Sequence, residues 1–256
     1  MAAPLHRPAR LMRWLASALL VLGASALAEP LQVAVASNFA VPAHKIAAAF
    51  EQTTGQAVRL SVGATGKFYA QIRHGAPFAV LLAADSETPA RLVKEGLAVR
   101  GSAFTYAIGQ LVLWSPQPGL VDAQGQVLRG PLPGKLAIAE PRLAPYGAAA
   151  QQTLERLGLL APLRAQLVTG ENIGQAYQFV ASGNAALGFV ALSQLMADGR
   201  IAAGSWWRVP DDWHTPIRQD AVLLKKGEHL AAARAFLQHL RSEASRETLR
   251  AHGYRI

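Results

Sequence analysis

Residues 31–39, LQVAVASNF, carry the pattern that decides the fold, an apolar run that stops at a short loop of neutral, hydrogen-bonding residues. The run Leu31 to Ala36 is typical of a buried β-strand, and helix-spaced apolar residues follow from about Ala43 to Phe50. A strand, a short loop and a helix in this order form the basic unit of an α/β protein. Ligands of such proteins bind at the carboxyl ends of strands, where this loop lies.

The same succession of strand-like run, short loop and helix-like pattern occurs four times. The four junctions are Ser37-Asn38-Phe39, Ala64-Thr65-Gly66, Pro145-Tyr146-Gly147 and Glu171-Asn172-Ile173. The N–H groups at a helix N-terminus have no intrahelical partner and carry a partial positive charge. Four such ends at one point would bind an anion without lysine or arginine. Each junction alone is equally well explained as a turn or a helix cap, so the prediction depends on all four together.

Strands and helices continue to alternate along the chain. Further strands are expected at residues 58–62, 79–83, 110–114, 136–138, 187–190 and 221–224. Further helices are expected at residues 67–73, 87–94, 146–157, 173–182, 229–240 and 244–252. This order predicts α/β units with largely parallel sheets.

The N-terminus has the features of a secretory signal peptide. Residues 1–13 contain three arginines and no acidic residue, an apolar run follows at residues 14–22, and Ala26-Leu27-Ala28 fits a small-x-small cleavage site. We expect cleavage after about Ala28 and a periplasmic location, and a retained N-terminal anchor is the alternative. The chain contains no cysteine, which excludes a lipoprotein anchor, disulfides and thiolate metal sites. Removing the signal leaves 256 − 28 = 228 residues, enough for one large or two modest domains.

The net charge is +9, and it falls to +6 without the three arginines of the signal peptide. Basic residues are scattered, and only Lys225-Lys226 are adjacent. An exported protein rarely meets nucleic acid, and the chain has no aromatic-studded basic stripe. We therefore expect no nucleic-acid partner and interpret the charge as a weak steering field for small anions.

The sequence contains none of the common catalytic or metal-binding motifs. The sequence has no G-x-S-x-G, H-E-x-x-H or G-x-G-x-x-G, and no histidine pair has the i, i+4 spacing of a helical zinc site. Lys67 follows Gly66 as in a P-loop, but the other P-loop residues are missing, so a solvated position in a first helical turn is expected. A triad of Ser37, His44 and Asp85 has no local support. Binding is favoured over catalysis, and an exported enzyme acting on an anionic substrate is the alternative.

Several segments, in this order, resemble the periplasmic molybdate/tungstate-binding proteins of ABC importers, the ModA-type substrate-binding proteins. The segments are Val33 to Phe39, Gly66 to Ile72, Gly75 to Pro77, Ala144 to Ala149, Gly170 to Ile173 and Leu187 to Ser193. The resemblance extends from about residue 31 to Gly253-Tyr254. It implies a type II periplasmic binding fold, in which two α/β lobes with mixed, mainly parallel sheets hold the anion between them. Lobe one would comprise residues 29–107 plus 217–256, and lobe two residues 108–216.

The resemblance also implies which residues hold the oxygens of the anion. They are Ser37 with Asn38 beside it, Thr65, Tyr146 and the backbone N–H of Ile173, with Asn172 and Ala64 as weaker candidates. The oxyanion is the ligand, so no cofactor and no direct protein-to-metal ligand are expected. The implied partner is the permease of an ABC-type membrane importer, which would receive the anion from a monomeric protein.

The sequence departs from the family pattern in two places. Some relatives have a ligand tyrosine after the Phe-Val strand, where this chain has Ala191. We expect the hydroxyl or the amide of Tyr146 to supply the missing contact. Ala79 and Ala83 replace an aspartate and a serine of relatives and are expected to be structural positions.

The chemistry of the anion agrees with this reading. Molybdate and tungstate are dianions that present only acceptors, so a site made only of donors suits them. Hydrogen-phosphate carries a proton and would favour a carboxylate in the site, whereas Glu140 and Glu171 are expected to face away. Sulfate also presents only acceptors and would have to be excluded by cavity size. A binder of sulfate or of another tetrahedral oxyanion is therefore the alternative within the same class.

Overall fold

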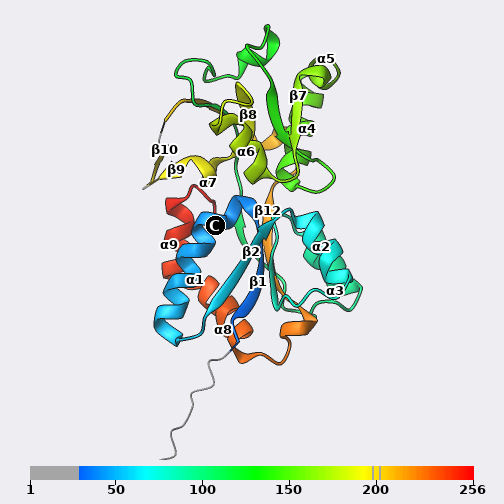
Figure 1. The fold of residues 1–256 in the computed structure, drawn as a ribbon, viewed down its shortest axis with the longest axis vertical. Coiled ribbons are helices and arrows are strands. Elements are labelled where there is room, and N and C mark those ends of the chain that lie inside the picture. Colours follow the sequence, from blue (N-terminus) through cyan, green and yellow to red (C-terminus); the bar gives the residue numbers. More distant parts are fainter. Residues whose placement is uncertain (1–28, 198, 202) are drawn as a thin grey trace, which may run out of the picture.

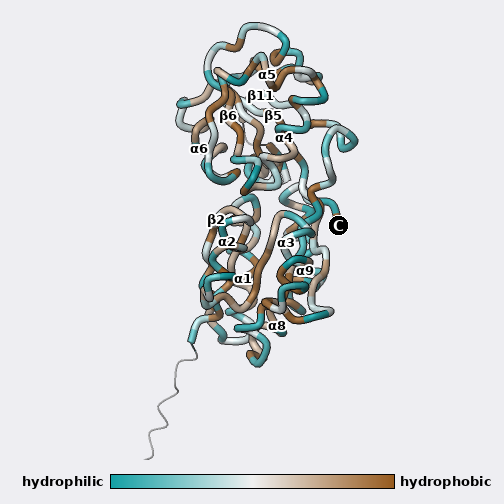
Figure 2. The backbone as a smooth tube through the Cα atoms, turned by 90° about the vertical axis from the view of Figure 1, so that its right-hand side faces the viewer, coloured by the Kyte–Doolittle hydropathy of each residue, from teal (hydrophilic) through white to brown (hydrophobic). Residues whose placement is uncertain are grey.

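Two five-stranded sheets organise the chain in a computed structural model that describes residues 29–197, 199–201 and 203–256. Each sheet and its flanking helices form one lobe, and the lobes lie end to end (Figure 1; Figure 2, turned by 90°). The predicted signal peptide, residues 1–28, lies outside the described residues. Among those described, no helix has the length and apolar character needed to cross a membrane.

The first lobe is built on a sheet with strand order β2-β1-β3-β12-β4. Its strands are β1 (Leu31–Ala36), β2 (Val58–Gly63), β3 (Val80–Leu82), β4 (Phe104–Ile108) and β12 (Arg218–Leu223). Strand β1 is parallel to β2 and β3, and β12 is antiparallel to β3 and β4. The fourth strand in this order, β12, therefore comes from a segment more than one hundred residues after the end of β4.

Helices cover both faces of this sheet because its central strands are apolar on both sides. Val33 and Val35 pack with one group of helices, α1 (Ala40–Thr54), α8 (Ala231–Leu240) and α9 (Glu243–Ala251). Ala34 points to the opposite face and packs with the other group, α2 (Thr65–Arg73) and α3 (Glu87–Lys94). Successive strand residues point to opposite faces, so a continuous apolar run requires both layers.

The second lobe has strand order β11-β5-β8-β6-β7. Its strands are β5 (Leu111–Ser115), β6 (Leu136–Ala139), β7 (Leu167–Gly170), β8 (Leu187–Ala191) and β11 (Ser205–Arg208). Its helices are α4 (Pro145–Arg156), α5 (Leu160–Leu163), α6 (Ile173–Ala181) and α7 (Leu192–Leu195). A small hairpin and five 3-10 helices complete the described elements: β9 (Met196–Ala197), β10 (Arg200–Ile201), η1 (Ser37–Phe39), η2 (Gln126–Arg129), η3 (Arg164–Gln166), η4 (Asp211–Trp213) and η5 (Lys225–Gly227).

The two-lobed α/β architecture confirms the predicted fold class. Each sheet is mixed, with two parallel and two antiparallel strand pairings. Three strands of the two large sheets were not predicted, β4, β7 and β11, and neither was the hairpin of β9 and β10. Strand β11, Ser-Trp-Trp-Arg, is short and pairs on one side only, with β5, so its sequence lacks the apolar run of a central strand.

The register of the parallel strands brings the junctions level with one another. In the first lobe Ala36 is paired with Gly63, so the loops that follow β1 and β2 begin side by side. In the second lobe Ala139 is paired with Gly170, which aligns the loops after β6 and β7. Each lobe therefore contributes two of the four predicted junctions at the carboxyl ends of neighbouring parallel strands.

Candidate functional site

A small cavity lies between the lobes where the four junctions meet. The space within it that the centre of a water-sized sphere can occupy is about 10 Å³, far below the ~300–1,000 Å³ of pockets for drug-sized ligands. None of the residues that line it is charged. They are Ala36, Ser37, Asn38, Gly63, Ala64, Thr65, Ala84, Ala144, Pro145, Tyr146, Asn172 and Ile173. Every residue predicted for the anion site, including the weaker candidates Ala64 and Asn172, is in this set.

Two hydroxyl groups of the first lobe are oriented by backbone N–H groups. The Oγ of Ser37 accepts a hydrogen bond from the N–H of Gly174 at 3.2 Å. The Oγ1 of Thr65, which is buried, accepts from the N–H of Ala84 at 3.1 Å. Because a lone pair of each oxygen is occupied, each hydroxyl proton is available to an acceptor in the cavity.

The second lobe presents two helix N-termini to the cavity. Tyr146 is the second residue of α4, and Ile173 is the first residue of α6. Their N–H groups lie in first turns, which offer no intrahelical acceptor, and neither bonds to another described residue. The side chain of Asn172 accepts from the N–H of Gln175 at 3.1 Å. Asn172 thus caps its own helix, while Ile173 and Tyr146 offer backbone donors.

The hydroxyl of Tyr146 contacts the first lobe through Gln219 of β12. It accepts a hydrogen bond from Nε2 of Gln219 at 3.2 Å. A Cβ atom placed on Gly109 would be only 2.1 Å from the tyrosine oxygen, so the hydroxyl lies against the segment that connects β4 to β5. Burial raises the pKa of Tyr146 well above its ordinary value. The phenol therefore stays protonated and neutral at physiological pH.

A buried polar cluster that no sequence motif indicates lies beside the cavity. Gln219 is fully buried, and its Oε1 accepts from Nδ2 of Asn38 at 2.9 Å and from the Tyr106 hydroxyl at 3.0 Å. The Tyr254 hydroxyl donates to the backbone carbonyl of Asn38 at 2.9 Å. Burial raises the pKa values of Tyr106 and Tyr254, so both remain hydrogen-bond donors. Strand β12 and the C-terminal segment thus hold the loop at Ser37–Phe39, although no local motif marks them.

The lobes also contact each other around the cavity. The N–H of Gly66 donates to the carbonyl of Leu143 at 2.9 Å, which joins α2 to the loop before α4. Lys67 forms an ion pair with Glu171. Lys67 is exposed in the first turn of α2, as expected, and in addition its side chain reaches the other lobe. Glu171 does not line the cavity, as predicted.

The remaining side chains considered from the sequence contribute nothing to the cavity. Glu140 pairs with Arg142 instead of lining the site. Asp85 accepts hydrogen bonds from Thr88, and His44 is exposed, so no triad forms with Ser37. Ala79, Ala83 and Ala191 are buried but do not line the cavity. In the described part of the chain no group of three or more histidine or acidic residues is placed to hold a metal ion.

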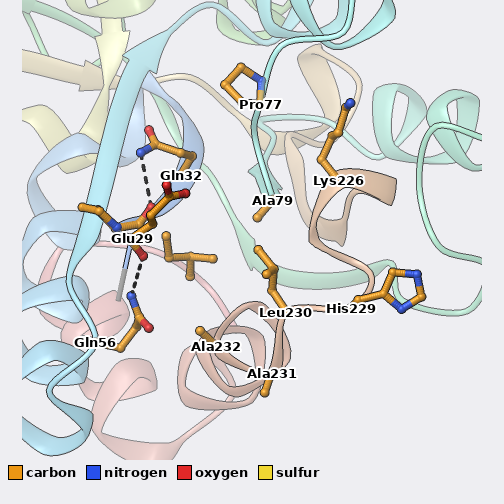
Figure 3. A pocket seen from close by; sticks show the side chains of 12 residues that line it. Glu29, Gln32, Gln56, Pro77, Ala79, Lys226, His229, Leu230, Ala231 and Ala232 are labelled. Atoms are coloured by element: carbon orange, nitrogen blue, oxygen red, sulfur yellow. Dashed lines mark hydrogen bonds between the residues drawn. The ribbon is translucent and has the colours of Figure 1, made fainter. Parts of the chain in front are cut away.

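A second hollow lies at the far end of the first lobe (Figure 3). Its glutamines hold the backbone of the first described residues: Nε2 of Gln32 donates to the Pro30 carbonyl at 3.2 Å, and Nε2 of Gln56 donates to the Glu29 carbonyl at 3.0 Å. These amides are already used in structural hydrogen bonds, and the second lobe adds no residue to the lining. The cavity between the lobes is therefore the better candidate site.

Comparisons with known proteins agree with this geometry. A family model described as bacterial extracellular solute-binding protein matches residues 31–255. The molybdate-binding protein ModA of Azotobacter vinelandii is 53% identical over 91% of this chain and 93% of the relative. ModA of Rhodobacter capsulatus is 50% identical over 86% of each chain. The solved structure of the A. vinelandii periplasmic molybdate-binding protein matches with a TM-score of 0.86 and 43% identity, over 88% of this chain and 99% of that structure.

Proposed function

The chain belongs to the family of bacterial extracellular solute-binding proteins, and from this we propose that it captures molybdate or tungstate in the periplasm and delivers the anion to an ABC-type importer. The identity of about one half to two ModA proteins supports molybdate as the ligand. The anion is the transported ligand and not a cofactor. In this proposal the protein is no enzyme, acts as a monomer and has no nucleic-acid partner.

One observation carries the proposal: the cavity offers hydrogen-bond donors from both lobes and no charged side chain. The hydroxyls of Ser37 and Thr65 each accept one hydrogen bond from a backbone N–H group, and their protons can donate into the cavity. The N–H groups of Tyr146 and Ile173 add donors from two helix N-termini. An unprotonated oxyanion presents only acceptors and therefore matches all of these groups.

The same arrangement supports a transport cycle. The mature protein begins after cleavage of the signal peptide at about Ala28. Its lobe one comprises residues 29–107 plus 217–256, and its lobe two comprises residues 108–216. Each lobe supplies only half of the donors, so the site is complete only when the lobes are closed. A hinge motion at the two connecting segments would capture and release the anion. The importer permease would then recognise the closed form.

Isothermal calorimetry of the mature protein, residues 29–256, tests the proposal. Molybdate and tungstate should bind tightly and with 1:1 stoichiometry, whereas sulfate should bind much more weakly, since a smaller anion cannot reach donors of both lobes at once. Phosphate should bind poorly, because its proton finds no carboxylate acceptor in the cavity. Preferred binding of sulfate would identify a different tetrahedral oxyanion as the ligand. Absence of binding to all four anions would refute the proposal.

The ion pair between Lys67 and Glu171 should slow release of the anion. Both side chains are partly exposed, so the pair contributes about 0.2–1 kcal/mol. Lys67→Met should therefore weaken molybdate binding roughly 1.4- to fivefold, mainly through faster dissociation in stopped-flow measurements. The difference from wild type should disappear at 1 M salt, where the pair is screened. Lys45→Met, which removes the same charge from an exposed site on α1, should leave the dissociation rate unchanged.

A further inference from the structure

Asn38 lines the cavity, and only the nitrogen of its side-chain amide has hydrogen-bond partners. Its Nδ2 donates to Oε1 of Gln219 at 2.9 Å and to the Tyr254 hydroxyl at 3.0 Å. Its Oδ1 is buried and has no hydrogen-bond partner among the described residues. Since Nδ2 is engaged with the polar cluster, the unpartnered oxygen lies on the other edge of the amide. An acceptor at this place would repel an anion that itself presents only acceptors.

Exchanging the oxygen and nitrogen of the amide removes this conflict. The two ends of an amide have nearly the same shape, so a half-turn of the group keeps the packing and inverts the hydrogen bonding. With Asn38 reversed, Nδ2 faces the cavity as a donor, and Oδ1 faces Gln219 and Tyr254. Gln219 must then be reversed as well, because two carbonyl oxygens cannot share a hydrogen bond.

We propose, on the basis of the function proposed above, that Gln219 is a positioning residue whose amide reverses together with that of Asn38 when the oxyanion binds. In the bound state Nε2 of Gln219 donates to Oδ1 of Asn38, and Nδ2 of Asn38 donates to the anion. Oε1 of Gln219 then accepts the proton of the Tyr146 hydroxyl. Two amides, one on the loop after β1 and one on β12, thus act as a coupled pair.

The reversed network satisfies the surrounding groups at the same heavy-atom separations. The second N–H of the Gln219 amide donates to the Tyr106 oxygen, 3.0 Å away. The Tyr106 hydroxyl in turn donates to the Ala83 carbonyl at 3.2 Å. Ser193 continues to donate to the Asn38 carbonyl at 2.8 Å, which leaves the Tyr254 proton for Oδ1 of Asn38. The only groups left without an internal partner are the N–H groups of Asn38 that face the anion.

This network assigns the role of Tyr146. Its hydroxyl donates to Gln219 in the bound state and is not a ligand of the anion, so Tyr146 contributes through its backbone N–H at the start of α4. Tyr146→Phe should consequently bind molybdate within about threefold of wild type. A hydroxyl that bonds directly to the dianion would instead make this variant at least tenfold weaker, and that result would overturn the assignment.

A double-mutant cycle measured by molybdate calorimetry tests the positioning role of Gln219. Asn38→Leu keeps the approximate size of the side chain and removes the donor, and it should weaken binding tenfold or more. Gln219→Met should weaken binding about tenfold in the wild-type background and less than twofold in the Asn38→Leu background. Equal losses from Gln219→Met in both backgrounds, or an Asn38→Leu variant that binds as tightly as wild type, would overturn the inference. Thermal unfolding without anion reports whether each variant is folded.

Side-chain amide resonances of the wild-type protein give a test that needs no variant to fold. Saturating molybdate should shift the side-chain ¹H–¹⁵N amide signals of both Asn38 and Gln219. The Asn38 amide protons should move downfield, because they form hydrogen bonds to the anion. Unchanged signals in a protein that binds molybdate would refute the coupled reversal alone. A wild-type protein that binds no oxyanion would refute the proposed function, and this inference with it.

Discussion

Replacing Thr65 by valine is expected to weaken molybdate binding roughly 10- to 150-fold. Valine has the shape of threonine but lacks the hydroxyl, so the buried Oγ1 that lines the cavity is lost as a donor. A hydrogen bond to a charged group contributes about 1.5–3 kcal/mol, which corresponds to this range of affinity. Calorimetry with molybdate measures the change directly.

The same substitution has a second consequence, which is independent of the anion. Oγ1 of Thr65 is the acceptor for the N–H of Ala84. With valine this buried N–H loses its partner, and the free energy of unfolding should fall by about 1–3 kcal/mol. Thr65→Ser keeps the hydroxyl and should restore most of the affinity and stability. A Thr65→Val variant with wild-type affinity would show that this hydroxyl does not touch the anion.

The four junctions could be predicted because each is a local feature. An apolar run specifies a buried strand, the loop after it is short, and the spacing of apolar residues changes to that of a helix. Strand Leu31–Ala36 and helix Glu87–Lys94 have the predicted bounds. Strand register then brings the junctions together, since Ala36 is paired with Gly63 and parallel strands end at one edge of the sheet.

The polar cluster behind the cavity could not be predicted, because its contacts join distant parts of the chain. Gln219 is separated from Asn38 by 181 positions and Tyr254 by 216. A glutamine in a strand and a tyrosine near the C-terminus carry no motif that would connect them to an anion. The contact of Lys67 with Glu171 likewise depends on how the two lobes approach each other, 104 positions apart. Local patterns identify the donors in the loops, and only the tertiary structure identifies the groups that orient them.

Gly109→Ala is expected to weaken molybdate binding roughly 5- to 150-fold by opposing closure of the lobes. Gly109 lies in the segment that connects β4 to β5, and an alanine Cβ there would be 2.1 Å from the Tyr146 oxygen and 2.7 Å from Nε2 of Gln219. Overpacking of this kind costs about 1–3 kcal/mol, which converts to that loss of affinity. Gly109 and Tyr146 both fall within residues 108–216 of the second lobe, whereas Gln219 belongs to the first, so only the clash with Gln219 is relieved when the lobes separate. The substitution should therefore weaken calorimetric affinity and also lower the thermal stability of the anion-free protein.

Two variants separate this effect from a general effect of alanine. Gly130→Ala makes the same chemical change where no atom lies within 4 Å of the added Cβ, and it should bind like wild type. Tyr146→Phe removes the oxygen that the new methyl group meets, so it should recover part of the affinity lost by Gly109→Ala. Recovery should be incomplete, because Cζ of the same ring is 2.9 Å from the Cβ position. If Gly109→Ala binds like wild type, the closed arrangement around Tyr146 is not the one that holds the anion.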